Sequence, residues 1–195
     1  MGLFNFNSKY KYKPIGVEYA EEVLLLFAYS CRLDDYYTKV FGKPSVELEI
    51  INTYEKDVAA VLSKGKCYGC FKGEQLVGIL LSFGILDWRN NHRDDYDHFF
   101  FGENRDDDEE DVWVQSLIKF LESRGESPLY IPIICTRDEH RCKGIASNLI
   151  KRLSDDLSDR YVLISDATHS QAMPMWLSNG FRELSIEGDV KLVVR

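Results

Sequence analysis

The first third of the chain carries apolar residues at the three- and four-residue spacing of helices. Residues 10–15 can form a short strand, and residues 17–31 have one apolar helical face after a start that bears glutamates. Two more helices are predicted over residues 33–41 and from Pro44 through residue 63. The spacing places four side chains of the 17–31 helix in the core: Leu24, Phe27, Ala28 and Cys31.

Strand patterns dominate the middle of the chain and alternate with helices after it. Residues 66–72 and 75–83 flank Gly73-Glu74, a turn that predicts a hairpin. Residues 129–136 are nearly all apolar, which is typical of a strand buried on both faces. The rest predicts a helix over 144–157, a strand over 161–167, a helix over 170–178, and strands over 181–186 and 190–194. This order predicts an α/β fold with a mixed central sheet flanked by helices.

A long polar segment separates the hairpin from the buried central strand. Residues 86–111 are polar, aromatic and acidic without a period, and a helical stripe over 112–124 follows, ending at Gly125. Long connections often cover functional sites, so this acidic insertion is a candidate wall for a substrate. It can equally be a solvated surface whose carboxylates stabilise the start of the next helix.

The composition fits one globular domain over residues 1–195. The chain is 45% apolar and shows no internal repeat or low-complexity linker. The start lacks a basic stretch followed by an apolar segment, and no apolar run is long enough for a bilayer, so we expect a cytoplasmic protein without a membrane partner.

The net charge of −8 is concentrated in one segment. Residues 94–111 hold ten acidic residues and one arginine, or −9, which leaves about +1 for the remainder by subtraction. An acidic total argues against nonspecific nucleic-acid binding, which needs lysines and arginines against phosphates. A cationic partner is the expectation.

Five cysteines without a secretory signal predict reduced thiols. Cys67 and Cys70 have the spacing of half a zinc site, but strand residues three apart face opposite sides, and no second pair follows. We therefore expect no metal site.

The turn between the buried strand and the next helix has the chemistry of a diphosphate site. The first backbone NH groups of a helix lack partners and carry the positive end of its dipole. Gly144 allows close backbone approach, Ala146 keeps the next turn narrow, and Arg141 and Lys143 add positive charge.

These residues resemble the pyrophosphate signature of the GNAT superfamily of acyl-CoA N-acyltransferases. Arg141-Cys142-Lys143-Gly144-Ile145-Ala146 fits the pattern [Q/R]-x-x-G-x-[G/A] at every fixed position, and residues 172–181 look like that family's later signature. The resemblance covers residues 129–195 well. It implies a GNAT-like fold with acetyl-CoA as acyl donor. It also implies that the backbone of Ile134, Cys135 and Thr136 pairs with the pantetheine and acyl group, while the NH groups of residues 142–146 hold the pyrophosphate.

The resemblance leaves the proton donors unassigned. Trp176 stands where many family members have a tyrosine near the sulfur, and an indole NH does not usefully release a proton. His169 is a candidate base or acid, or only a residue at a helix start. Asp166 ends a predicted strand, where it either orients an amine or caps a helix. Asp87 and Trp88 are candidate acceptor contacts, or a turn aspartate and a packed indole.

We therefore expect an N-acetyltransferase that moves an acetyl group to a primary amine of a small molecule or peptide by direct attack. A ping-pong route through Cys135 is the less favoured chemistry, because buried strand cysteines are mostly inert. One rival is a catalytically silent acyl-CoA-binding sensor, and another is an interaction protein that uses the acidic insertion. A homodimer through the last strands is possible.

Overall fold

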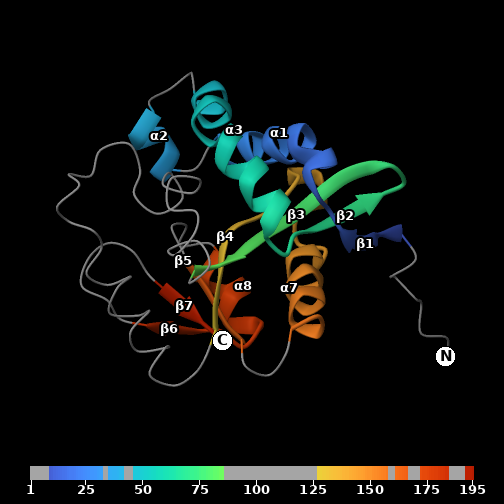
Figure 1. Ribbon diagram of the computed structural model, residues 1–195, viewed down its shortest axis with the longest axis vertical. Coiled ribbons are helices and arrows are strands. Elements are labelled where there is room, and N and C mark those ends of the chain that lie inside the picture. The colour runs from blue at the N-terminus through green and yellow to red at the C-terminus, as the bar shows by residue number, and fades with distance from the viewer. Residues whose placement is uncertain are drawn as a thin grey trace.

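The computed structural model describes residues 9–32, 35–41, 46–85, 127–157, 161–166, 172–184 and 192–195. Within these ranges one mixed sheet has the strand order β1-β2-β3-β4-β5-β7-β6 (Figure 1). The strands are β1 Lys11–Pro14, β2 Tyr68–Lys72, β3 Gln75–Gly84, β4 Ser127–Thr136, β5 Tyr161–Asp166, β6 Arg182–Leu184 and β7 Leu192–Val194. The pair β4 and β5 is parallel, and the other neighbours are antiparallel. The predicted mixed α/β sheet is confirmed.

Helices cover both faces of this sheet. They are α1 Ala20–Cys31, α2 Asp35–Phe41, α3 Val46–Lys64, α7 Ile145–Asp155 and α8 Met173–Ser178, with 3-10 turns at η2 Val17–Tyr19 and η4 Asp138–His140. Helices α1 and α3 pack on one face and α7 on the other (Figure 1). No helix within the described residues is long and apolar enough to cross a membrane.

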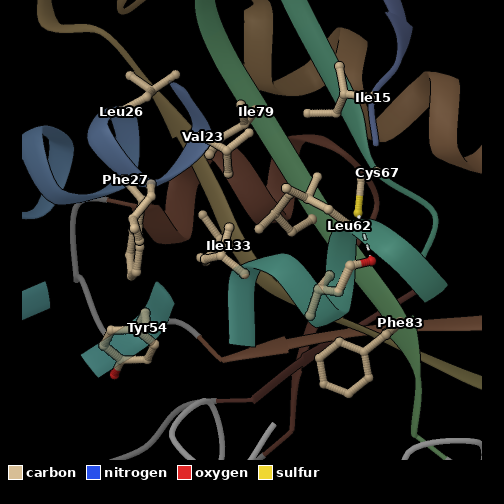
Figure 2. Packing of buried hydrophobic residues seen from close by; sticks show 14 of the residues in the cluster. Ile15, Val23, Leu26, Phe27, Tyr54, Leu62, Cys67, Ile79, Phe83 and Ile133 are labelled. Atoms are coloured by element: carbon tan, nitrogen blue, oxygen red, sulfur yellow. Dashed lines mark hydrogen bonds between the residues drawn. The ribbon is translucent and has the colours of Figure 1, made fainter. Parts of the chain in front are cut away.

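Two hydrophobic cores fill the layers. The core under α1 and α3 contains Val23, Phe27, Ile79 and Ile133 (Figure 2). The core under α7 contains Leu149, Ile150, Trp176 and Phe181. Cys67 belongs to the first core and Cys70 to the second, which confirms that these two thiols face opposite sides of the sheet.

The pairing of the central strand β4 with β3 shifts in register beside Pro132. Tyr130 lies opposite Phe83 and Ile133 lies opposite Leu81, so β4 has one more residue than β3 across this step. Such an extra residue is a β-bulge. Proline has no backbone NH to donate to the ladder, so within a central strand it is typically found at a bulge. A bulge bends its strand, and this one lies where the pairing of β4 with the neighbour on its other side ends.

That neighbour, β5, follows β4 only for the first part of its length. The parallel ladder runs from Ser127 opposite Tyr161 to Tyr130 opposite Ile164. In the described part of the chain, no strand pairs with the β5-facing edge of β4 beyond Tyr130. The two strands therefore separate, and the end of β4 has an edge that no described strand covers.

Most predicted elements are present with small changes at their ends. The hairpin at Gly73-Glu74 is confirmed, and Gly73 has φ +64°, which favours glycine. The helix predicted over 144–157 begins one residue later, because Gly144 is its N-cap with φ +73°. The helix predicted over 170–178 is shorter and begins at Met173, next to Pro174. The acidic insertion and the helix predicted over 112–124 lie outside the described residues.

Candidate acyl-donor site

A pocket opens where β4 leaves β5. Its volume is about 680 Å³, within the range of small-molecule sites. Phe27 and Tyr37 line it from the helices on one face of the sheet, and Met175 and Trp176 of α8 line it from the other. The gap between the strands thus connects the two faces, so two reactants can meet there from opposite sides.

The structure brings the predicted strand end and the predicted turn to this one pocket. Ile134, Cys135 and Thr136 line it from β4, and the turn contributes Arg141, Cys142, Gly144, Ile145 and Ala146. Lys143 is exposed and does not line the pocket, and its Nζ donates to the carbonyl of Glu139. This contact keeps the ammonium group of Lys143 close to the turn.

The backbone of the turn has the geometry of an anion-binding loop. Arg141 has φ −62°, Cys142 has φ +56° and Gly144 has φ +73°, while Lys143 has negative φ. Left-handed residues in a turn can bring neighbouring NH groups to the same side of the backbone. The left-handed Cys142 is unusual for a side chain with a Cβ atom, which indicates that the turn imposes this conformation.

The NH groups of this turn are available to a ligand. The first helical bond of α7 runs from the NH of Asn148 to the carbonyl of Gly144, 3.0 Å apart, and the Asn148 side chain donates to the same oxygen at 2.9 Å. Among the residues that the structure describes, the NH groups of residues 142–146 have no hydrogen-bond partner. Together with the helix dipole, they fit a phosphate group.

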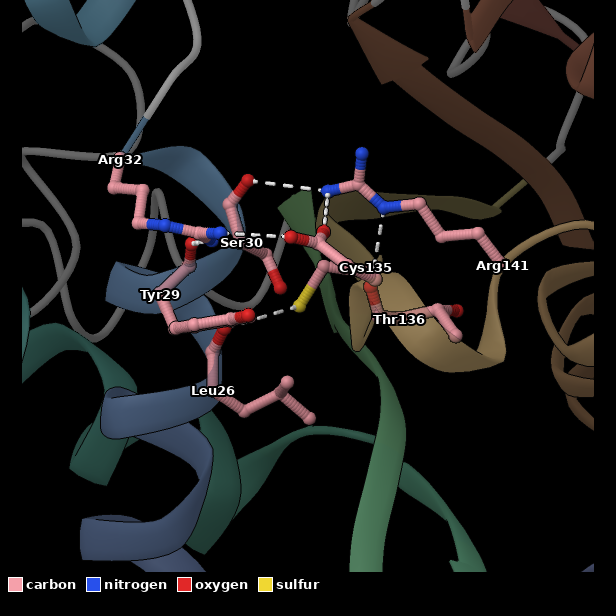
Figure 3. A network of polar contacts seen from close by, with 8 residues as sticks. Leu26, Tyr29, Ser30, Arg32, Cys135, Thr136 and Arg141 are labelled. Atoms are coloured by element: carbon pink, nitrogen blue, oxygen red, sulfur yellow. Dashed lines mark hydrogen bonds and ion pairs between the residues drawn. The ribbon is translucent and has the colours of Figure 1, made fainter.

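Arg141 does not point into the turn but bridges three neighbouring segments (Figure 3). Its Nη2 lies 2.8 Å from Oδ1 of Asp138. It also makes long contacts of 3.5 Å from Nη2 to the carbonyl of Ser30 and from Nε to the carbonyl of Thr136. The guanidinium therefore lies between the end of α1 and the end of β4, beside the pocket.

The surroundings of Cys135 favour the protonated thiol. Burial raises its pKa to about 12, although nearby Ser30 and the positive charges of Arg141 and Arg137 act in the opposite direction. Its Sγ lies 4.0 Å from the carbonyl of Leu26. These surroundings do not favour an acyl-enzyme intermediate at this residue.

His140 is a pocket residue that the sequence reasoning missed. The ring is only 3% exposed, Nδ1 shares a hydrogen bond of 2.9 Å with the Tyr10 hydroxyl, and the two rings meet edge-on. Burial is the main cause of its lowered pKa, and the charges of Lys72 and Lys143 act in the same direction. Its place directly before the motif was the available signal, but its partner is 130 positions away.

Trp176 is almost fully enclosed. Its exposed fraction is 2%, and its ring packs against Phe181 with centroids 4.8 Å apart. Asp166 is the last residue of β5, as predicted, but its side chain lies outside the described part of the structure. Asp87, Trp88 and His169 lie outside the described residues.

Solved structures share this architecture over nearly the whole chain. An agmatine N-acetyltransferase mutant has a TM-score of 0.65 and 11% identity, covering 96% of this chain and 99% of its own. The C-terminal condensation domain of Ebony, in complex with beta-alanyl-dopamine, has a TM-score of 0.63 and 10% identity over 96% and 98%. The PaiA N-acetyltransferase of Thermoplasma acidophilum, in complex with coenzyme A, has a TM-score of 0.61 and 11% identity over 95% and 98%.

These similarities show the fold of the chain. No family model matches the sequence, and no curated protein sequence matches it. The chain has a GNAT-type fold, with a mixed sheet flanked by helices.

Proposed function

We propose that this protein is an N-acetyltransferase that transfers an acetyl group from acetyl-CoA to a primary amine of a small molecule or peptide. The observation that carries the proposal is the free edge of β4 beside the unpartnered NH groups of residues 142–146, both on one pocket. The fold shared with acetyltransferases supports it.

The donor would bind along both features. The pantetheine arm contains two amide groups, and an extended chain of amides can pair with an open strand edge. Ile134, Cys135 and Thr136 provide this edge, and their side chains are half-buried. The diphosphate would accept hydrogen bonds from the turn at Gly144, where Cys142 and Gly144 both have left-handed backbone.

The reaction needs the amine and the thioester to be held in position, and it needs no covalent enzyme intermediate. The amine nitrogen attacks the thioester carbonyl carbon, the carbon–sulfur bond breaks, and the thiolate leaves as the amine gives a proton to a base or to water. Cys135 would stay a thiol, and Trp176 would shape the pocket without supplying the proton. Backbone NH donors near the end of β4 would polarise the carbonyl oxygen.

The acceptor would approach from the side of α1 and α2. Phe27, Ser30 and Tyr37 line the pocket there, opposite α8. One neighbour in fold acts on agmatine and another was solved with beta-alanyl-dopamine, which supports an amine acceptor. We further propose that Asp87 and Trp88 contact the amine, with Asp166 or His169 as the base. The acidic residues 94–111 would favour cationic amines.

Calorimetric titration of acetyl-CoA, followed by a thiol-release assay across amines, tests the proposal. We expect one saturable site and release of CoA thiol with cationic amines such as agmatine, a polyamine or a lysine-rich peptide. Neutral primary amines of similar size serve as the comparison. Absence of both heat and thermal stabilisation would overturn the assignment of the pocket to acetyl-CoA.

A catalytically silent acyl-CoA-binding module is the second candidate. It is favoured by Trp176, because an indole at this place gives the leaving thiolate no acid. Intact acetyl-CoA binding without thiol release on any amine of the panel would favour this second candidate.

A further inference from the structure

The carboxylate of Asp138 is shared between two arginines from distant parts of the chain. Its Oδ2 lies 2.7 Å from Nη2 of Arg32, at the end of α1, and its Oδ1 lies 2.8 Å from Nη2 of Arg141. Arg32 also donates to the carbonyl of Tyr29, and its guanidinium lies over the Tyr29 ring at 3.7 Å (Figure 3). Arg32 is therefore the better-held partner.

Asp138 is anionic at neutral pH. The hydrogen bond from Arg32 and the positive charges of Arg141 and Arg32 lower the pKa of its carboxyl group, against the opposing effect of burial. The residue belongs to η4, three positions before Arg141. A negative charge thus lies next to the turn that would receive a diphosphate.

We propose that Asp138 is a positioning residue that competes with the donor's diphosphate for Arg141, and that Arg32 limits this competition by sharing the carboxylate. The inference rests on the proposed function, because it concerns the acyl-donor pocket. It gives the pair Arg32 and Asp138 a role in setting the affinity for CoA.

Arg141 is held loosely enough to change partners. Its side chain is 53% exposed, and its contacts to the carbonyls of Ser30 and Thr136 are both 3.5 Å long. A partly exposed ion pair contributes little, whereas a phosphate offers several charge-assisted hydrogen bonds. When Arg141 turns to the diphosphate, Asp138 keeps its ion pair with Arg32. The carboxylate of Asp138 therefore remains paired with a positive charge.

The first experiment compares Asp138→Asn with Glu139→Gln in calorimetric titrations of CoA. Asp138→Asn should lower the dissociation constant of CoA by about two- to fivefold, since it frees Arg141 from an exposed pair. Glu139 forms no ion pair within the described residues, and Glu139→Gln removes the same charge one position away. That control should change the dissociation constant by no more than about 1.5-fold, because an exposed charge is screened at physiological salt.

Pantetheine, which has no phosphate, is the second ligand in the same titrations. Its affinity should be equal in wild type and Asp138→Asn, because Arg141 has no anion to bind there. An equal gain for pantetheine and CoA would mean that Asp138 acts on the shape of the pocket, and it would overturn the proposal.

Arg32→Gln tests the shared carboxylate. Without Arg32, Asp138 should hold Arg141 more firmly, so CoA affinity should fall by about two- to fivefold. In the Asp138→Asn background the same change should have no effect on CoA affinity. Equal losses of CoA affinity in the wild-type and Asp138→Asn backgrounds would show that Arg32 acts through the structure of α1 and not through Asp138, and would overturn this part of the proposal.

The outcomes separate this inference from the proposed function. Failure of wild type to bind CoA would overturn the proposed function. Binding of CoA by wild type with unchanged or weaker binding by Asp138→Asn would overturn the competition alone. Loss of a stabilising ion pair cannot imitate the expected result, because a loosened turn would weaken CoA binding rather than strengthen it.

Discussion

The side chain of Ser165 closes the point at which the two parallel strands separate. Its Oγ donates a hydrogen bond of 2.9 Å to the carbonyl of Ile131, one residue beyond the last ladder pair of Tyr130 and Ile164. Ser165 is 2% exposed and lines the pocket. A buried side-chain hydroxyl thus takes over where the backbone ladder stops, and it fixes the inner end of the opening.

Ser165→Ala should weaken the contact between β4 and β5 where the two strands separate. We expect the free energy of unfolding to fall by about 1 kcal/mol, because the carbonyl of Ile131 loses a buried donor. The dissociation constant of CoA should rise by about threefold as the strand end shifts. Ser154→Ala, which removes a hydroxyl that donates to the carbonyl of Ile150 in α7, is the control and should leave CoA affinity unchanged. Equal CoA binding by Ser165→Ala and wild type would contradict the role of Ser165 at the pocket.

Gly144→Asp should abolish CoA binding. It places a carboxylate and a side chain where the diphosphate would lie, at a residue with φ +73°. Gly73→Asp is a matched control, because Gly73 has φ +64° in the β2–β3 turn, and an added Cβ would meet nothing within 4 Å. Both variants should lose about 1 kcal/mol of stability from the left-handed backbone. Only Gly144→Asp should lose CoA binding in calorimetry, and a variant that bound like wild type would refute the diphosphate site.

Cys135 should carry no acetyl group during turnover. With its pKa raised to about 12 by burial, about one thiol in ten thousand is ionised at pH 8. Intact-mass spectrometry after incubation with acetyl-CoA alone should show no acetylated Cys135, and Cys135→Ala should retain transfer activity of the same order. Iodoacetamide should modify the exposed Cys142 first. An acetyl adduct on Cys135 that disappears when amine is added would support a ping-pong route instead.

His140 should make the fold sensitive to mild acid. Its folded-state pKa is lowered by burial, so the unfolded chain binds more protons near and below pH 6.5. The stability that this residue contributes is present above that value and is lost as the pH falls through it. His140→Gln should therefore show a smaller drop in Tm between pH 7.5 and 5.5 than wild type.

Tyr10→Phe provides the comparison for His140. It removes the hydroxyl that bonds to Nδ1 but keeps the ring beside the imidazole. We expect a lower Tm at both pH values with the acid-sensitive drop retained. Identical pH profiles for wild type and His140→Gln would assign the acid sensitivity to other groups.

Local patterns predicted most of the fold because they depend on neighbours in sequence. The turn at Gly73-Glu74 and the apolar face of α7 are examples. The left-handed φ of Gly144 was within reach of the sequence, because a glycine at that place already suggested close backbone approach. The bulge was also signalled, since Pro132 interrupts a run that otherwise reads as a central strand.

The parts of the site that were missed depend on contacts between distant positions. Arg32 and Asp138 are 106 residues apart, and Tyr10 and His140 are 130 apart. No period or motif connects such pairs, and only the packing of α1 on the sheet and the pairing of β1 with β2 bring them together. The pKa of Cys135 likewise depends on what covers it, although the inertness of a buried strand thiol was expected in general terms.

Cys67 and Cys70 lie on opposite faces of the sheet, so each thiol can report on the helices that cover its own face. Burial raises their pKa values to about 12 and about 11, so neither thiol reacts readily while its layer is closed. Cys67 becomes reactive when the helices α1 and α3 lift from the sheet, and Cys70 when α7 does. Their alkylation rates in dilute denaturant therefore distinguish a protein that opens as one cooperative unit from one whose two halves open independently.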